Sequence, residues 1–252
     1  MLYLAVMPAI VLLSYICRKD TVEKEPAGLL IKLFFLGVLS TASAYILELA
    51  AEVLFEDFLM RGDVLSIAVE NFLFVALFEE IGKYFFLKKA TWRSEHFNYV
   101  FDAVVYAVTV SLGFATLENI FYVSDGGIGV AIVRGLLSVP GHAVFGVFMG
   151  AWYGIAKTRE AAQDDAGVRR NLTLALWVPT LLHGFYDFCL SMDDEIFLIV
   201  FFAFEIICTV LAIRTVKRLS KGDHPIGALP QAPFGNLREN TFEVEEKWHR
   251  RG

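Results

Sequence analysis

Two adjacent carboxylates and a lysine, Glu79, Glu80 and Lys83, lie inside a long apolar segment of the chain. Placing one ionisable side chain in hydrocarbon costs at least about 3 kcal/mol, so such residues usually face a polar interior and mark a functional site. Three further apolar segments carry polar groups of the same kind: Glu118 with Asn119, then His142, then His183 with Asp187. Carboxylates and imidazoles are the usual general acids and bases of enzymes. Their spread over four apolar segments favours an active site over a membrane anchor.

Spacing within a helix brings several of these groups together. Positions three and four apart share a helix face, so Lys83 is a neighbour of both Glu79 and Glu80. We expect one glutamate to pair with Lys83, because an opposite charge favours the ionised form, and the other to be free for chemistry. His183 lies beside Asp187 in the same way, and a carboxylate often orients a catalytic histidine.

A purely structural role is the alternative for each group. The two glutamates could form only an ion pair, Glu118 could reach water at the membrane boundary, and His142 could make one interhelical hydrogen bond. An ion pair with Lys83 needs one acid and not two, which favours chemistry. Three other charged residues are assigned to helix ends or to support: Asp102, Arg134 and Glu70.

The composition is that of a polytopic membrane protein. Hydrophobic residues make up 56% of the 252 residues, and 23 are Phe; the mean hydropathy is +0.56. Only helices satisfy their backbone hydrogen bonds segment by segment in lipid, and a spanning helix needs roughly 17–25 residues. The sequence therefore predicts an all-α fold with seven transmembrane helices, at about 1–17, 28–54, 64–87, 99–123, 128–156, 171–192 and 196–213.

The first segment and the glycines within the segments give two further expectations. The first segment has no basic region before it and no small-residue cleavage site, so we expect a retained helix and not a signal peptide. Small residues allow helices to approach closely in a membrane. The glycines within the predicted spans include Gly28, Gly37, Gly113, Gly135, Gly141, Gly146, Gly150 and Gly184.

Lysine and arginine predict the orientation in the membrane. Basic residues follow the first, third, fifth and seventh segments, at 18–24, 88–93, 157–170 and 214–221. The alternate loops hold Arg61 and otherwise only acids. The positive-inside rule then places the N-terminus outside and the C-terminus in the cytoplasm. At about 1.5 Å per residue, the polar groups fall in the middle and outer parts of their spans, which predicts a cavity open to the outside.

Residues 1–218 thus form the predicted transmembrane core, and 219–252 a polar cytoplasmic tail that is expected to be largely unstructured. The three cysteines, Cys17, Cys189 and Cys208, show no CxxC spacing and indicate neither a disulfide framework nor a zinc site. No basic patch is interleaved with aromatic residues, so nucleic acid is not expected as a partner.

Four motifs, each in a separate predicted span, carry a resemblance to a known family. They are EExxK at Glu79 to Lys83, FxxxE at Phe114 to Glu118, the isolated His142, and HxxxD at His183 to Asp187. Over the seven-span core the sequence resembles the PrsW family of bacterial intramembrane proteases. It is similar, more distantly, to the CAAX prenyl endopeptidases and bacteriocin-processing enzymes.

The resemblance implies peptide-bond hydrolysis in or near the bacterial plasma membrane. It also implies a substrate, a single-span anti-sigma factor, whose first cleavage leads to release of an extracytoplasmic-function sigma factor. Prenyl endopeptidases carry a histidine where this chain has Glu118, so their water-activating pair does not transfer directly.

A metal-free mechanism is the preferred chemistry, and it needs no cofactor. Glu79 acts as general base on a water, while His183, held by Asp187, stabilises the oxyanion. Glu80 pairs with Lys83 in this scheme. The groups that would hold the water or support the site are Glu118, His142, Phe114 and Asn119.

Two alternatives remain open. A divalent metal such as zinc would lower the pKa of a bound water, with Glu79, Glu118, His142 and His183 as ligands, although no HExxH helix is present. A transporter could use buried carboxylates to relay protons or cations, but no inverted halves are visible. The expected partners are a single-span membrane substrate and membrane lipid.

Overall fold

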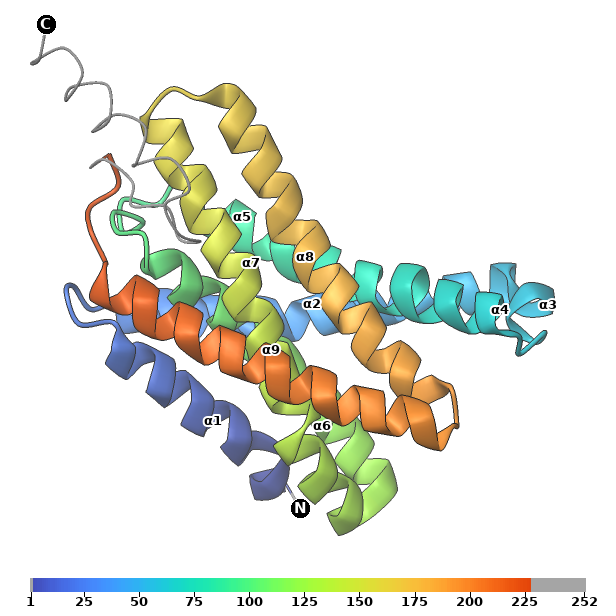
Figure 1. Ribbon diagram of the computed structural model, residues 1–252. Coiled ribbons are helices and arrows are strands. Elements are labelled where there is room, and N and C mark those ends of the chain that lie inside the picture. Colours follow the sequence, from blue (N-terminus) through green and yellow to red (C-terminus); the bar gives the residue numbers. More distant parts are fainter. Residues whose placement is uncertain (1, 228–252) are drawn as a thin grey trace, which may run out of the picture.

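The computed structural model describes residues 2–227, all of whose regular structure is helical (Figure 1). The longer helices are α1 (Leu2–Lys19), α2 (Ala27–Leu54), α5 (Leu77–Thr91), α6 (Asp102–Leu136), α7 (Ser138–Ala161), α8 (Asp165–Ser191) and α9 (Glu195–Lys221). The short ones are α3 (Glu56–Leu59), α4 (Val64–Val69) and the π-helix η1 (Glu70–Ala76). The predicted all-α fold is confirmed, while residues 228–252 of the predicted tail lie outside the described part.

Four helical stretches of the described chain are long and apolar enough to cross a membrane. They are Leu2–Lys19, Ala27–Leu54, Asp102–Ala161 and Glu195–Lys221. The third stretch contains both α6 and α7. The molecule is therefore a membrane protein, and the count of seven spans stays a prediction.

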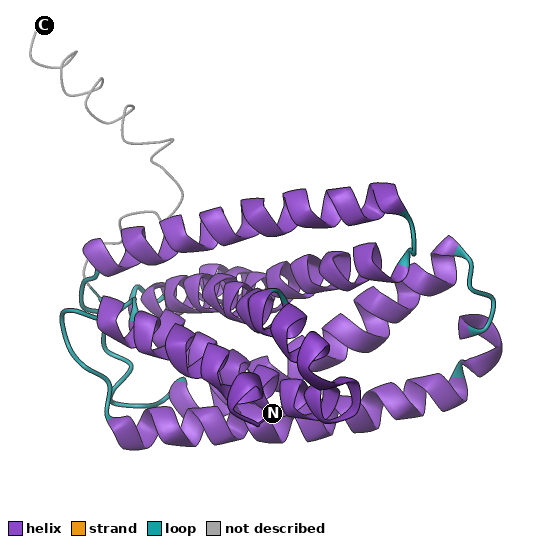
Figure 2. Cartoon of the chain, turned by 90° about the horizontal axis from the view of Figure 1, so that it is seen from below, coloured by secondary structure: helices purple, strands orange, loops and turns teal. Residues whose placement is uncertain are grey.

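Helix α6 is the central element of the bundle. Every residue from Asp102 to Thr116 is buried, as expected for a helix that is apolar on all sides and enclosed by other helices. Figure 1 and Figure 2 show α9 on one side of the molecule and α2 on the opposite side. The site residues of the neighbouring helices can therefore converge on α6.

The crossing of α2 and α6 depends on two glycines. A Cβ atom at Gly37 would lie 2.0 Å from the carbonyl oxygen of Val110, and one at Gly113 would lie 2.0 Å from that of Phe34. Only glycine permits backbones to approach this closely. The contact at Gly113 fixes the position of α6 relative to α2, directly before Phe114, the first residue of the FxxxE motif.

The predicted segments at 99–123 and 128–156 differ from the observed helices. Gly127 breaks α6 with φ 74° and ψ −158°, and α7 begins only at Ser138. The side chains of Arg134 and Asn119 are in contact, although 15 residues of straight helix would separate them by roughly 22 Å. Residues after Gly127 therefore fold back along the first part of α6. An apolar sequence alone does not indicate such a reversal of chain direction.

The basic segments predicted to be cytoplasmic lie at one end of the bundle. Lys157 near the end of α7 donates to the carbonyl oxygen of Trp92, directly after α5, at 2.7 Å. Ser220 near the end of α9 donates to the carbonyl oxygen of Lys19 at the end of α1 at 2.5 Å. These contacts join the ends of four helices, as the alternating topology requires.

Candidate active site

The helix that carries the two glutamates is irregular just before them. Between α4 and α5 the backbone of η1 forms π-helical hydrogen bonds in place of α-helical ones. A π-helical turn widens the helix and rotates the side chains that follow it. Such turns are frequent at functional sites. A Cβ atom at Gly184 of α8 would lie 2.5 Å from the ring of Phe72 in η1. This close approach brings His183 against the start of α5.

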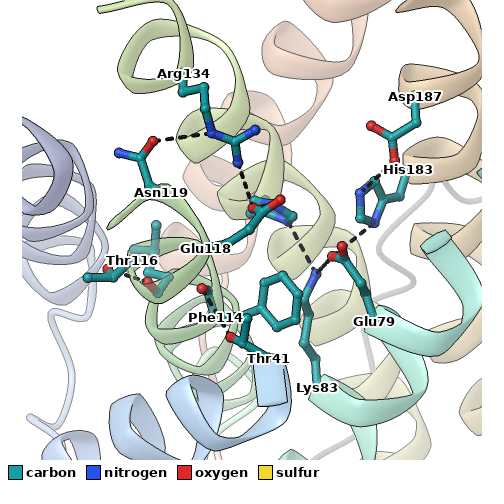
Figure 3. Close-up of polar contacts among 12 residues, drawn as sticks. Thr41, Glu79, Lys83, Phe114, Thr116, Glu118, Asn119, Arg134, His183 and Asp187 are labelled. Atoms are coloured by element: carbon teal, nitrogen blue, oxygen red, sulfur yellow. Dashed lines mark hydrogen bonds and ion pairs between the residues drawn. The ribbon is translucent and has the colours of Figure 1, made fainter. Parts of the chain in front are cut away.

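Lys83 is at the centre of the site (Figure 3). Its Nζ lies 3.0 Å from Oε2 of Glu79 and 2.7 Å from Oε1 of Glu80. It also lies 3.2 Å from Nδ1 of His142 and 3.9 Å from the ring centroid of Phe114. The expectation that one glutamate stays free of the lysine is therefore wrong in this geometry, because Nζ reaches both preceding positions on the same helix face.

His142 links Lys83 to Glu118. An ammonium group only donates hydrogen bonds, so Nδ1 of His142 accepts from Lys83 and Nε2 carries the proton. That Nε2 donates to Oε2 of Glu118 at 2.9 Å. The same oxygen lies 2.8 Å from Nη2 of Arg134. Glu118 is thus held from two sides.

Asn119 connects this branch to α1. Its amide nitrogen donates to the carbonyl oxygen of Ala5 at 2.8 Å, and its oxygen accepts from Nε of Arg134 at 3.3 Å. The guanidinium of Arg134 also lies 3.9 Å from the ring centroid of Tyr122. The returning part of α6 therefore supports Glu118, which agrees with a supporting role for Arg134.

His183 forms the second branch. Its Nε2 lies 3.1 Å from Oδ2 of Asp187, and its Nδ1 lies 3.1 Å from Oε1 of Glu80 and 3.8 Å from Oε2 of Glu79. The imidazole stacks on Phe145 with ring centroids 4.9 Å apart. The predicted pairing with Asp187 is present, and a contact with Glu80 adds to it.

The structure brings all nine predicted site residues into one region: Glu79, Glu80, Lys83, Phe114, Glu118, Asn119, His142, His183 and Asp187. Burial differs across it. The side chain of Glu80 is fully enclosed, whereas those of Glu118 and Asp187 keep 18% and 25% of their exposure. The site is therefore accessible from the side of these two residues.

Two charged residues assigned to helix ends or support lie elsewhere. Asp102 accepts from the backbone nitrogens of Asn98 and Tyr99 at the start of α6, as assigned. Glu70 is exposed at the start of η1, with no support role visible within residues 2–227. Sequence reasoning also missed Glu48, a carboxylate inside the second apolar segment, although intramembrane charge was the signal used elsewhere.

The donor atoms of Glu79, Glu80, His142 and His183 all lie within 4.8 Å of one another. By type, carboxylate oxygens and imidazole nitrogens suit a divalent metal. The set differs from the predicted one, since Glu80 takes the place of Glu118. The ammonium of Lys83, however, lies within 3.2 Å of three of the four residues, so this arrangement does not accommodate a second cation among them.

Comparison with known proteins gives one consistent result. Residues 25–213 match the family described as PrsW family intramembrane metalloprotease. Protease PrsW of Oceanobacillus iheyensis is 35% identical over 86% of this chain and 94% of its own length. The protein of the same name from Bacillus subtilis is 41% identical over 74% of this chain and 80% of its own. No solved structure matches the chain. The chain belongs to the PrsW family of intramembrane proteases.

Proposed function

We propose that this protein is a multi-pass protease of the bacterial plasma membrane that makes the first cut in a single-span anti-sigma factor. One observation carries the proposal: a continuous, largely buried chain of polar contacts joins Asp187, His183, Glu80, Lys83, His142 and Glu118. Burying so many ionisable groups in a membrane protein costs free energy, and such groups usually serve a function. Membership of a protease family makes hydrolysis the function they support best.

Glu79 is the group best placed to activate water. Its Oε2 contacts Lys83, its side chain keeps 6% of its exposure, and its Oε1 has no hydrogen-bond partner in the described part of the chain. Glu80 is enclosed and contacts both Lys83 and His183. In the proposed reaction, Glu79 takes a proton from the attacking water and later delivers it to the leaving amine.

His183 is the group proposed to stabilise the oxyanion. Both of its nitrogens face carboxylates, Nδ1 toward Glu80 and Nε2 toward Asp187. A doubly protonated imidazole, with an N–H on each side and a positive charge, matches carboxylates on both sides. Its positive charge and that of Lys83 would oppose the negative charge that develops on the scissile carbonyl oxygen.

A cleavage assay tests the proposed function. The chain is co-expressed with candidate single-span anti-sigma factors, and the substrate is followed for a truncated product. We expect the product to disappear with Glu79→Gln and His183→Ala, while the amount of protease in the membrane stays near normal. Full activity of Glu79→Gln would transfer the role of base to Glu80.

A metal-removal experiment tests the metal-free step. Purified protein is treated with a chelator for a prolonged time, its metal content is checked by elemental analysis, and cleavage is measured. Because Lys83 provides the positive charge among the donors, we expect a rate similar to that of untreated protein. Loss of activity with specific rescue by zinc would overturn this mechanism and make Glu79, Glu118, His142 and His183 candidate ligands.

A further inference from the structure

A groove of about 600 Å³ lies beside the active site, between α2, α3 and η1. Its wall is apolar in part, with Tyr45 of α2 and Phe74 of η1, but it also carries four glutamates, Glu48, Glu52, Glu56 and Glu70. In the predicted topology this end of α2 and the short helix α3 face the outside. Figure 1 shows α3 and α4 at the end of the molecule away from the centre of the bundle.

None of these four carboxylates has an ionic or hydrogen-bonding partner within residues 2–227. The basic residue nearest in sequence to Glu56, Arg61, is already paired with Asp63 at 2.5 Å. Glu48 lies about two turns before the end of α2, well inside a stretch long and apolar enough to span the membrane. The ionised form of a carboxylate without a salt bridge is unfavourable at such a depth, and a basic group from a partner would stabilise it.

The groove lies near the catalytic residues, although none of them lines it. Glu48 is close enough to Lys83, Glu118 and His183 to interact with them electrostatically. Phe74, which lines the groove, stacks on Phe78 with ring centroids 6.1 Å apart, and Phe78 directly precedes Glu79. A polypeptide lying in the groove would therefore contact the helix segment that leads to Glu79.

The arrangement of the carboxylates favours an extended ligand over a single ion. Within the described chain, the only group of side chains close enough together to hold a metal is the one around Glu79. The glutamates of the groove are instead spread over three elements, since Glu48 and Glu52 belong to α2, Glu56 to α3 and Glu70 to η1. Several separate positive charges on one chain match this spacing better than one cation.

We propose that the groove binds the extracytoplasmic flank of the single-span substrate, and that this flank carries lysine or arginine side chains that pair with Glu52, Glu56 and Glu70. The proposal rests on the proposed protease function, because it assigns a recognition role to a surface next to that site. Glu48, nearest the catalytic residues, would receive the basic side chain closest to the scissile bond. The groove thereby determines which single-span proteins are cut.

Binding is measured with the full chain carrying Glu79→Gln, which prevents turnover, in nanodiscs of phosphatidylcholine. The probe is a fluorescent single-span peptide with three lysines in its extracytoplasmic flank, and a second peptide carries glutamines in their place. We expect the lysine peptide to bind about tenfold more tightly, and the difference to shrink as NaCl screens the charges. The triple variant Glu52→Gln, Glu56→Gln, Glu70→Gln should abolish the preference.

The matched control removes three acids that lie in the predicted outer loops but do not line the groove: Asp57→Asn, Asp125→Asn and Glu195→Gln. This control should keep the preference. Equal binding of both peptides, or equal loss in the control, overturns the proposal. So does tight binding of Ca²⁺ alone to the groove without binding of the lysine peptide, which would make it a cation site.

Cleavage by the unsubstituted chain is measured in parallel with the same two peptides. Absence of cleavage with a normal flank preference counts against the proposed function and leaves the groove supported. Cleavage without any flank preference counts against the groove and leaves the protease function supported. The two failures are therefore distinguishable.

Discussion

Lys83 is the residue on which the geometry of the site depends. Its single positive charge lies between two glutamates, and its ammonium group fixes the tautomer of His142. A buried carboxylate without its counter-charge is strongly unfavourable. The lysine thus allows two adjacent glutamates to exist in one apolar segment.

Replacing Lys83 by Ala should therefore affect folding as well as catalysis. Two enclosed carboxylates would lose their partner, and breaking such a pair costs about 3–5 kcal/mol. We expect reduced protein in the membrane and no cleavage, measured by immunoblot and by substrate processing. Lys89→Ala, at an exposed position of the same helix, is the control and should change neither. Normal protein levels of Lys83→Ala would show that the glutamates do not need this charge.

Arg134 acts on the site through Glu118 and His142, so it is a positioning residue. Arg134→Gln removes the ion pair at 2.8 Å. We expect kcat to fall about tenfold with little change in KM, because the residue acts on the reacting groups only through Glu118 and His142. Arg134→Lys should restore part of the rate. Arg61→Gln, which breaks only an exposed pair with Asp63, is the control. A change confined to KM would place Arg134 in substrate binding instead.

At the scale of the elements, sequence patterns predicted most helices but not their irregularities. Apolar length located α1 and α2 within two residues at each end, because a spanning helix must be long and apolar. It also found α8 and α9, but the observed helices begin earlier or end later than the apolar segments. The same pattern cannot report a π-helical turn such as η1, since it depends on packing against α8 at Gly184. It also cannot separate the returning part of α6 from α7, because both are apolar.

The residues of the candidate site could be predicted because they are polar residues within apolar segments. Glu79, His142 and His183 each stand out as polar residues in apolar surroundings, and helical spacing placed Lys83 and Asp187 beside them. Contacts between different helices could not be predicted in this way. Those between Lys83 and His142 and between His183 and Glu80 depend on how α5, α7 and α8 cross.

The break at Gly127 gives a test at this scale. A residue with a side chain strongly disfavours φ 74° with ψ −158°, at a cost of about 1–3 kcal/mol. Gly127→Ala should lower the thermal stability of the purified protein and weaken cleavage, because the returning part of α6 delivers Arg134 to Glu118. Gly129→Ala is the matched control, since a Cβ atom there meets nothing within 4 Å. Equal effects of the two substitutions would exclude a specific role for the break.

At the scale of the whole molecule, sidedness is the property that links fold to function. The ends of α1, α5, α7 and α9 meet at one face through contacts such as that of Ser220 with Lys19. The positive-inside rule assigns this face to the cytoplasm, because its loops are basic. The groove and the exposed edges of Glu118 and Asp187 would then be reached from the outer side, where the flank of a substrate is available.

Reporter fusions test this orientation directly. A fusion after Lys221 should report the cytoplasm, and an insertion near Asp194, between α8 and α9, should report the exterior. Both positions flank α9, the most apolar of the candidate spans at a mean hydropathy of 2.9, so opposite signals are required if it crosses the membrane. The reverse pattern would place the acidic groove in the cytoplasm, where it could not meet an extracytoplasmic flank. Identical signals at both positions would instead show that α9 does not span the membrane, and the even alternation of basic and acidic loops would lose its structural basis.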